Sequence, residues 1–188
     1  ANGRAETRGI NGGLKKIAWG QDGVEPDDVV GLAYGRLARH LEKNHRVIRF
    51  AYDWRQSNLE QGAALAKVVK QALKDHPDQP VRILAHSMGG LVTRSMIAQH
   101  PDLWEGMAQR EGGRLVFLGT PHHGSHLMVE TLLGKSDTMR MLARLDLAHG
   151  LQTVLDIVAG FPGALQLLPQ PGFVDTAGPS VRDWLAAE

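Results

Sequence analysis

Short apolar segments alternate with amphipathic helical patterns along most of the chain, and this alternation is what most constrains the fold. Apolar residues that recur every three or four positions predict three helices, at 26–41, 57–73 and 88–100. Runs of apolar residues predict three short strands, at 47–52, 81–85 and 115–118. Strands that alternate with helices form parallel sheets whose faces are covered by those helices. The sequence therefore predicts an α/β fold with a parallel central sheet and helices on both faces.

Composition excludes several classes of protein. The 188 residues are about the length of one domain. The 21 Lys and Arg side chains balance 20 Asp and Glu, which argues against a nucleic-acid partner. The absence of Cys excludes a disulfide framework, a thiolate metal site and a Cys nucleophile. No apolar run approaches the roughly 18 residues that cross a bilayer, so we expect neither a transmembrane segment nor a signal peptide. The compartment and the oligomeric state stay open.

The pattern along the chain predicts three regions. Residues 1–25 carry six glycines and little periodicity, so we expect a loop with a partial strand. Residues 26–130 would form the α/β core. Residues 131–188 combine helical patterns at 139–147 and 151–158 with a tail rich in Pro and Gly. Within this third region, the apolar stretch 142–168 is either a lid and acyl-chain wall or a set of ordinary core helices.

Ser87 stands where the predicted strand 81–85 runs into a helix. Small residues, Ala85 and Gly89, lie two positions on either side of it. A serine in a sharp strand-to-helix turn has a strained backbone, and residues two positions away approach each other so closely that only Gly or Ala fits. This is the nucleophile-elbow pattern with Ala in place of the first Gly, and the Met88 amide would face an oxyanion there. The alternative is that Ser87 only caps the helix.

Two other segments end predicted strands at the same sheet edge, where open α/β sheets bind ligands. They are Tyr52-Asp53-Trp54-Arg55 and Gly119-Thr120-Pro121-His122-His123-Gly124-Ser125. Together with the segment Ala85-His86-Ser87-Met88-Gly89-Gly90, they resemble the lecithin:cholesterol acyltransferase-like branch of the α/β-hydrolases, which includes lipases, phospholipases and acyltransferases. The resemblance covers about residues 26–125, with a weaker similarity at 167–169.

The resemblance implies an α/β-hydrolase fold, incomplete at both ends, with Ser87 as the nucleophile and the Met88 amide as an oxyanion donor. The residues implied to line the substrate site are Tyr52, Asp53, Trp54, Thr120, Pro121, His122 and His123. Asp53 and Arg55 alternatively form a structural ion pair. His86 is expected to be a core histidine. Because no carboxylate lies at ligand spacing from the adjacent His122 and His123, we predict no metal, and we predict no cofactor.

A serine hydrolase also needs an acid and a base, which follow the nucleophile in that order in α/β-hydrolases. The acid must precede its histidine, and His149 is the last histidine of the chain. Asp137 with His149 is therefore the best pair that this chain offers. We therefore expect either a portion of a longer hydrolase, with its acid and base beyond Glu188, or a degenerate homologue that has lost the chemistry.

The leading hypothesis is a serine ester hydrolase of the lipase, esterase or acyltransferase type. It would act on an acyl ester or a lipid through an acyl-enzyme on Ser87. The alternative, from another class, is a non-catalytic binding module on the same scaffold. A nucleotide-binding domain is disfavoured because no Gly-rich phosphate loop follows a predicted strand. The acyl chain and its acceptor stay open.

Overall fold

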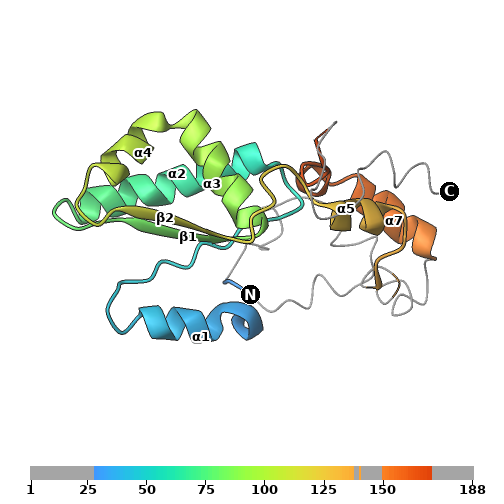
Figure 1. The fold of residues 1–188 in the computed structure, drawn as a ribbon, viewed down its shortest axis with the longest axis horizontal. Helices are drawn as coiled ribbons and strands as arrows, with labels where there is room; N and C mark the ends of the chain where they lie inside the picture. The colour runs from blue at the N-terminus through green and yellow to red at the C-terminus, as the bar shows by residue number, and fades with distance from the viewer. Residues whose placement is uncertain (1–27, 138–139, 141–149, 171–188) are drawn as a thin grey trace, which may run out of the picture. The chain divides into compact units, whose positions relative to one another are not determined.

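The computed structural model describes residues 28–137, 140 and 150–170. The chain divides into two compact units, residues 1–53 and 54–188. In the first unit the described residues contain the helix α1 (Gly31–Leu41), and in the second they contain two strands and the remaining helices, all but α8 labelled in Figure 1. None of the described helices is both long and apolar enough to cross a membrane.

The first unit differs from the prediction in two places. The helix begins at Gly31 rather than near Pro26. Residues 47–52, predicted as a strand, form none in the structure, so that prediction is wrong. An apolar run favours an extended backbone, but a strand also needs a neighbour that completes its hydrogen bonds. Arg49, within this extended segment, donates to Glu42 at 2.7 Å and to Asp28 at 3.1 Å.

The described sheet has two parallel strands, β1 (Arg82–His86) and β2 (Arg114–Leu118). Their register pairs Arg82 with Arg114 and His86 with Leu118, so both strands end at the same level. Alternate residues face opposite sides of a strand. Ile83, Ala85, Leu115 and Phe117 are at least half-buried, whereas Leu84, Val116 and Leu118 are exposed. The described residues therefore cover one face of the sheet, and helices on both faces stay a prediction.

Two helices lie over that face, α2 (Asn58–Asp75) and α3 (Met88–Gln99), and α4 (Pro101–Ala108) packs against both of them (Figure 1). The predicted helices at 57–73 and 88–100 are thus confirmed. Ser57 caps α2 by accepting a hydrogen bond from the Leu59 amide at 3.2 Å. The position of Pro101, directly after the predicted helix 88–100, suggests only that it ends that helix. In the structure Pro101 opens α4, because a proline fits the first helical position, where its missing N–H would have no partner.

The core of the second unit lies between α2 and α3. A Cβ at Gly62 would lie 2.8 Å from the Met96 backbone nitrogen, so the two helices can approach this closely only because position 62 is glycine. The buried apolar side chains around this contact are Leu65, Ala66, Val69, Val92, Met96 and Met107.

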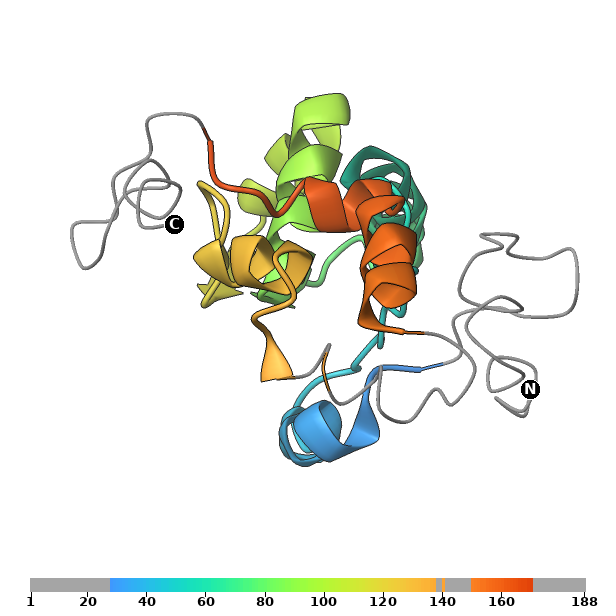
Figure 2. The same cartoon turned by 90° about the vertical axis from the view of Figure 1, so that its right-hand side faces the viewer.

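Three further helices form a second cluster: α5 (His126–Leu132), α7 (Leu151–Ala159) and α8 (Pro162–Leu165). α7 contacts both α5 and α8, and Figures 1 and 2 show α5 and α7 side by side. The helix predicted at 151–158 is confirmed, and the one predicted at 139–147 lies outside the described residues. The buried apolar side chains of α7, of α8 and of the residue Phe161 between them are Val154, Leu155, Ile157, Val158, Phe161 and Ala164.

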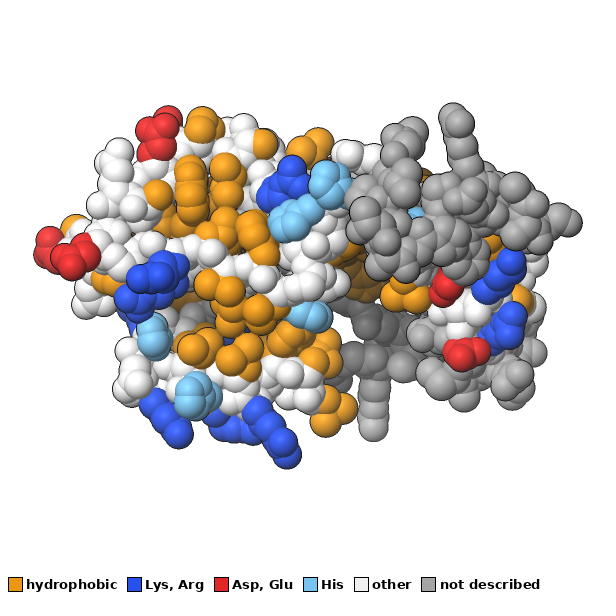
Figure 3. Space-filling model, viewed as in Figure 1, with side chains coloured by type: hydrophobic (Ala, Val, Ile, Leu, Met, Phe, Trp, Pro, Cys, Tyr) orange, Lys and Arg blue, Asp and Glu red, His pale blue; other side chains and the backbone are white. Residues whose placement is uncertain are grey.

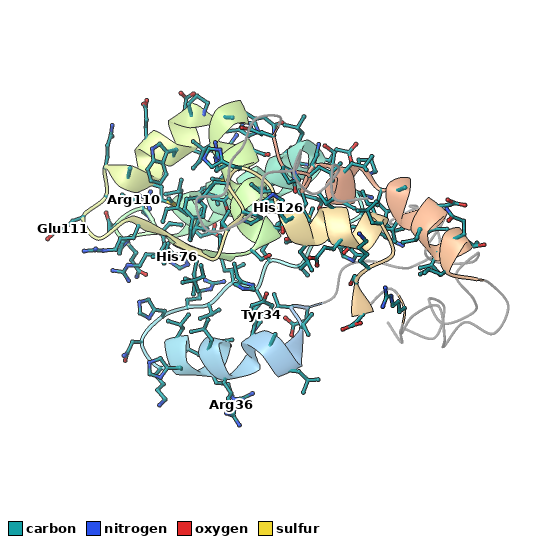
Figure 4. All side chains as sticks on the ribbon, turned by 45° about the vertical axis from the view of Figure 1, so that its right-hand side comes forward. Tyr34, Arg36, His76, Arg110, Glu111 and His126 are labelled. Carbon is teal, nitrogen blue, oxygen red and sulfur yellow. The ribbon has the colours of Figure 1, made fainter. Side chains whose placement is uncertain are left out.

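Arg110, labelled in Figure 4, ties the end of α2 to the turn before β2. Its guanidinium donates to the carbonyl oxygens of His76 at 2.7 Å, Gln79 at 2.9 Å and Leu73 at 2.9 Å. The last carbonyls of a helix have no partner within the helix, and a cation is favoured beside them.

We expect Arg110→Met to lower the free energy of unfolding by about 2 kcal/mol, because it removes hydrogen bonds from a charged donor to partly buried carbonyls. Urea titration followed by circular dichroism measures this loss. Arg110→Lys keeps the charge but loses the forked donor geometry, so it should show an intermediate loss. Equal stability of the Met variant and the parent chain would contradict the structural role.

Candidate functional site

Ser87 occupies the turn between β1 and α3, in the predicted order of strand, serine and helix. Its backbone has φ 51° and ψ −128°, and it is the only residue other than glycine with a positive φ in the described part of the chain. Such a conformation costs a residue with a Cβ about 1–3 kcal/mol. The Ser87 amide donates to the Leu118 carbonyl at 2.9 Å, which fixes the strained turn to the end of β2.

The capping alternative does not account for Ser87. The residue occupies the N-cap position of α3, but its side chain accepts no hydrogen bond from a helix amide. Ser57, at the same position of α2, does accept one. A serine at position 87 is therefore held in a strained turn without the hydrogen bond that usually stabilises a serine there.

The start of α3 packs directly against the loop that follows β2. A Cβ at Gly90 would overlap the Thr120 side chain, so glycine is required for this approach. The Thr120 hydroxyl is buried and has no hydrogen-bond partner among the described residues. The amides that open a helix carry its positive end, and the oxyanion role expected of the Met88 amide stays a prediction.

The loop 119–125 is tightly folded. Gly119 and Gly124 have φ of 55° and 99°, in the region that favours glycine. The His122 amide donates to the Thr120 carbonyl at 2.9 Å, and the Gly124 amide donates to the Pro121 carbonyl at 3.0 Å. The turns place Thr120 against α3 and fix Pro121 by its backbone.

The two histidines of this loop have different surroundings. The His122 ring lies edge-on to Phe117, with centroids 4.8 Å apart, and Arg94 donates to the His122 carbonyl at 3.2 Å. His123 is exposed. Among the described residues no three His, Cys, Asp or Glu side chains gather to hold a metal ion. His86 is also exposed, so the expectation of a core histidine is wrong. It follows the alternation of β1 and lies on its uncovered face.

The segment after α8 holds the loop in place, a contact that the sequence analysis missed. The Ser125 amide donates to the Leu167 carbonyl at 2.8 Å, and the Gln170 amide donates to the His123 carbonyl at 3.0 Å. A Cβ at Gly124 would overlap the backbone of Leu168 and Pro169. The signals that could have indicated this contact are the second glycine of the loop and the family similarity at 167–169.

Trp54 and Met88 meet at α8. The Trp54 ring packs edge-on against Phe161 with centroids 5.4 Å apart. The Gly163 amide donates to the Arg55 carbonyl at 3.1 Å. A Cβ at Gly163 would overlap the Trp54 carbonyl and lie 2.9 Å from Cε of Met88. Two predicted site residues from distant parts of the sequence are thus brought together by a glycine that sequence reasoning did not single out.

Tyr52 and Asp53 belong to the first unit, so their place at the site stays a prediction. The Tyr52 ring stacks on Phe50 with centroids 6.0 Å apart. Burial, with a smaller contribution from Tyr34, raises the pKa of Tyr52 to about 12. The phenol therefore stays protonated across the ordinary pH range and can serve as a hydrogen-bond donor but not as a base.

This shift predicts a change at alkaline pH. Below pH 10 the phenol is protonated in both the folded and the unfolded chain. As pH rises from about 10 to about 12, the unfolded chain releases the proton more readily, so stability falls by about 2 kcal/mol. Tyr52→Phe has no phenol to titrate, so it should not show this loss of stability. Urea midpoints measured at roughly pH 9 and pH 12, on either side of the shift, would show the difference. Parallel curves for parent and variant would contradict the burial of the phenol.

The acid and base predicted from the sequence are not brought to Ser87 by the described residues. Asp137 is exposed, directly before residues that are not described, and His149 lies outside the described residues. Their pairing stays a prediction.

Comparison with known proteins identifies the family. The chain is 27% identical over 99 residues to a protein of Arabidopsis thaliana called lecithin-cholesterol acyltransferase-like 4. That match covers 47% of this chain and only 18% of the relative. A model of the lecithin:cholesterol acyltransferase family matches residues 37–174, which include the turn at Ser87 and the loop 119–125. The chain therefore belongs to the lecithin:cholesterol acyltransferase family, in agreement with the motifs that resemble it.

Proposed function

We propose that this chain carries the nucleophile of a serine ester hydrolase or acyltransferase that acts on an acyl ester or lipid, and that Ser87 is that nucleophile. The observation that carries the proposal is the backbone of Ser87, held at φ 51° between a strand and a helix without a capping bond. Backbone strain of this kind persists only where the surrounding structure holds it in place, and it is concentrated at active sites. Membership of an acyltransferase family makes acyl transfer the chemistry to expect.

The proposed reaction has two steps. The Ser87 hydroxyl oxygen attacks the ester carbonyl carbon as its proton passes to a base, and negative charge develops on the carbonyl oxygen. Amides at the start of α3, that of Met88 first, donate hydrogen bonds to this oxyanion. The carbon–oxygen bond to the leaving alcohol breaks, the alcohol takes the proton, and an acyl-Ser87 ester remains. Water then gives hydrolysis, or a second alcohol gives transfer, and either frees the serine.

The neighbouring segments have proposed roles as well. Trp54, Thr120, Pro121, His122 and His123 would line the substrate site, together with Tyr52 and Asp53 from the first unit. Residues 26–130 would be the α/β-hydrolase core, and residues 131–188 would supply a cap. The contact of Gly163 with Trp54 and Met88 supports a wall beside the serine at this place. Asp137 and His149, or residues of a longer chain, would be the acid and base.

A fluorophosphonate probe tests the proposal, because it forms a covalent bond only with an activated serine. We expect labelling of the protein on Ser87, found by mass spectrometry of the tryptic peptide. Ser87→Ala should abolish labelling, whereas Ser95→Ala, in the same helix, should leave it unchanged. Labelling that survives in Ser87→Ala would overturn the assignment. A full-length protein that folds, takes no label and turns over no short-chain ester would favour the non-catalytic binding module.

A further inference from the structure

The polar face of α1 carries an unusual line of side chains. Leu32, Arg36, Arg39 and Lys43 stand four, three and four positions apart, and such spacing places them along one side of a helix and the turn that follows it. The three cations are exposed, and the relative exposure of Leu32 is 103%. A leucine is thus presented fully to solvent in line with positive charges.

This leucine is not part of the packing face of α1. The apolar residues Val30, Tyr34, Leu37, Ala38 and Leu41 recur every three or four positions and form the opposite side of the helix. Figure 4 shows Tyr34 and Arg36 on opposite sides of α1. Tyr34, Ala38 and Leu41 of that stripe are at least half-buried, whereas Leu32, on the other side of the helix, is fully exposed.

Among the described residues, no acidic side chain neutralises the positive charge of this face. Asp28 and Glu42, the described acidic residues that flank α1, both pair with Arg49. Arg36, Arg39 and Lys43 form no ion pair with any residue in the described ranges. Figure 3 shows Lys and Arg side chains along the lower edge, where Figure 1 draws α1. The chain has a net charge of only +1, so this concentration of positive charge is local.

We propose that the line formed by Leu32, Arg36, Arg39 and Lys43 docks the protein on the surface of an anionic phospholipid bilayer. The cations would lie at the level of the phosphate groups, and Leu32 would insert among the upper acyl chains, as amphipathic helices do at lipid interfaces. The exposed leucine favours a bilayer over a nucleic acid, which offers phosphates but no apolar layer beneath them. The proposal goes beyond the proposed catalysis and does not depend on Ser87.

Co-sedimentation with lipid vesicles tests the docking surface in the intact chain. We expect binding to vesicles of phosphatidylcholine with phosphatidylglycerol, and weak binding to phosphatidylcholine alone. Arg36→Gln with Arg39→Gln should lower the partition coefficient roughly 20-fold, and added NaCl should weaken binding of the parent. Leu32→Ser should lower it about fivefold with less effect on the salt dependence. Circular dichroism checks that each variant keeps its helical signal.

A matched control distinguishes the effect of this surface from the effect of total charge on vesicle binding. Lys67→Gln with Lys70→Gln removes two exposed cations from α2 and should leave vesicle binding nearly unchanged. An equal loss in both double variants would overturn the proposal, as would tighter binding to duplex DNA than to the anionic vesicles, abolished by the same α1 substitutions. Ser87→Ala should bind vesicles as the parent does, so failure of the catalytic assignment and failure of the docking surface are distinguishable.

Discussion

The Ser87→Gly variant is expected to be more stable than the parent chain by about 1–2 kcal/mol and to lose ester turnover about 10³-fold or more. The gain arises because Ser87 has φ 51° and ψ −128°, a conformation that glycine adopts without the steric cost of a Cβ. The loss arises because no other atom at this position can form the acyl-enzyme. Urea unfolding measures the first effect, and hydrolysis of a chromogenic ester measures the second.

Ser87→Ala is the matched control for this pair of effects. Alanine also has a Cβ, so it should lose turnover to the same extent without a gain in stability. A glycine variant no more stable than the alanine variant would show that the turn is not strained. If both variants retained turnover, Ser87 would not be the nucleophile, although the description of its backbone would still hold.

The second large effect is expected at Gly163. Gly163→Ala should lower the free energy of unfolding by about 3 kcal/mol, because the new Cβ would overlap the backbone carbonyls of Trp54 and Gln56, which cannot rotate away. The same substitution should displace the Trp54 ring from Phe161. The urea midpoint reports the first effect, and a shift in tryptophan fluorescence reports the second.

Gly106→Ala provides the comparison, because a Cβ at Gly106, within α4, would meet nothing within 4 Å. Alanine has the higher helix propensity, so this variant should be stabilised by about 0.5–1 kcal/mol. The two substitutions add the same methyl group and should move stability in opposite directions. A loss at Gly163 no larger than the effect at Gly106 would contradict the close contact between α8 and the segment 54–56.

The sequence predicts well those elements whose signals are local. The period of the apolar residues predicts α2 and α3, and the junction of β1 with α3 at Ser87 follows from a short apolar run and its small neighbours. The segment 47–52 has the composition of a strand, but pairing depends on a partner that composition does not reveal. Pro101 signals a boundary in either direction, and only the following residues show that a helix begins there.

The contacts that build the candidate site are the part that sequence reasoning missed. Gly163 reaches Trp54 and Met88, and the segment 167–170 reaches the loop 119–125, across more than 40 positions in each case. Such contacts leave no periodicity in the chain. A glycine and a short apolar segment are the only local traces, and each is common in loops.

The hydrogen bond from the Ser87 amide to the Leu118 carbonyl is the last one that joins the chain at the end of β1 to β2. Fraying at the carboxyl end of either strand would therefore release the strained turn before the helices lose any structure. On gentle warming, the proposed catalytic hydroxyl would lose its alignment while the far-ultraviolet spectrum still looked native. The temperature of heat inactivation would then measure the opening of the carboxyl ends of β1 and β2 and not the unfolding of the whole chain.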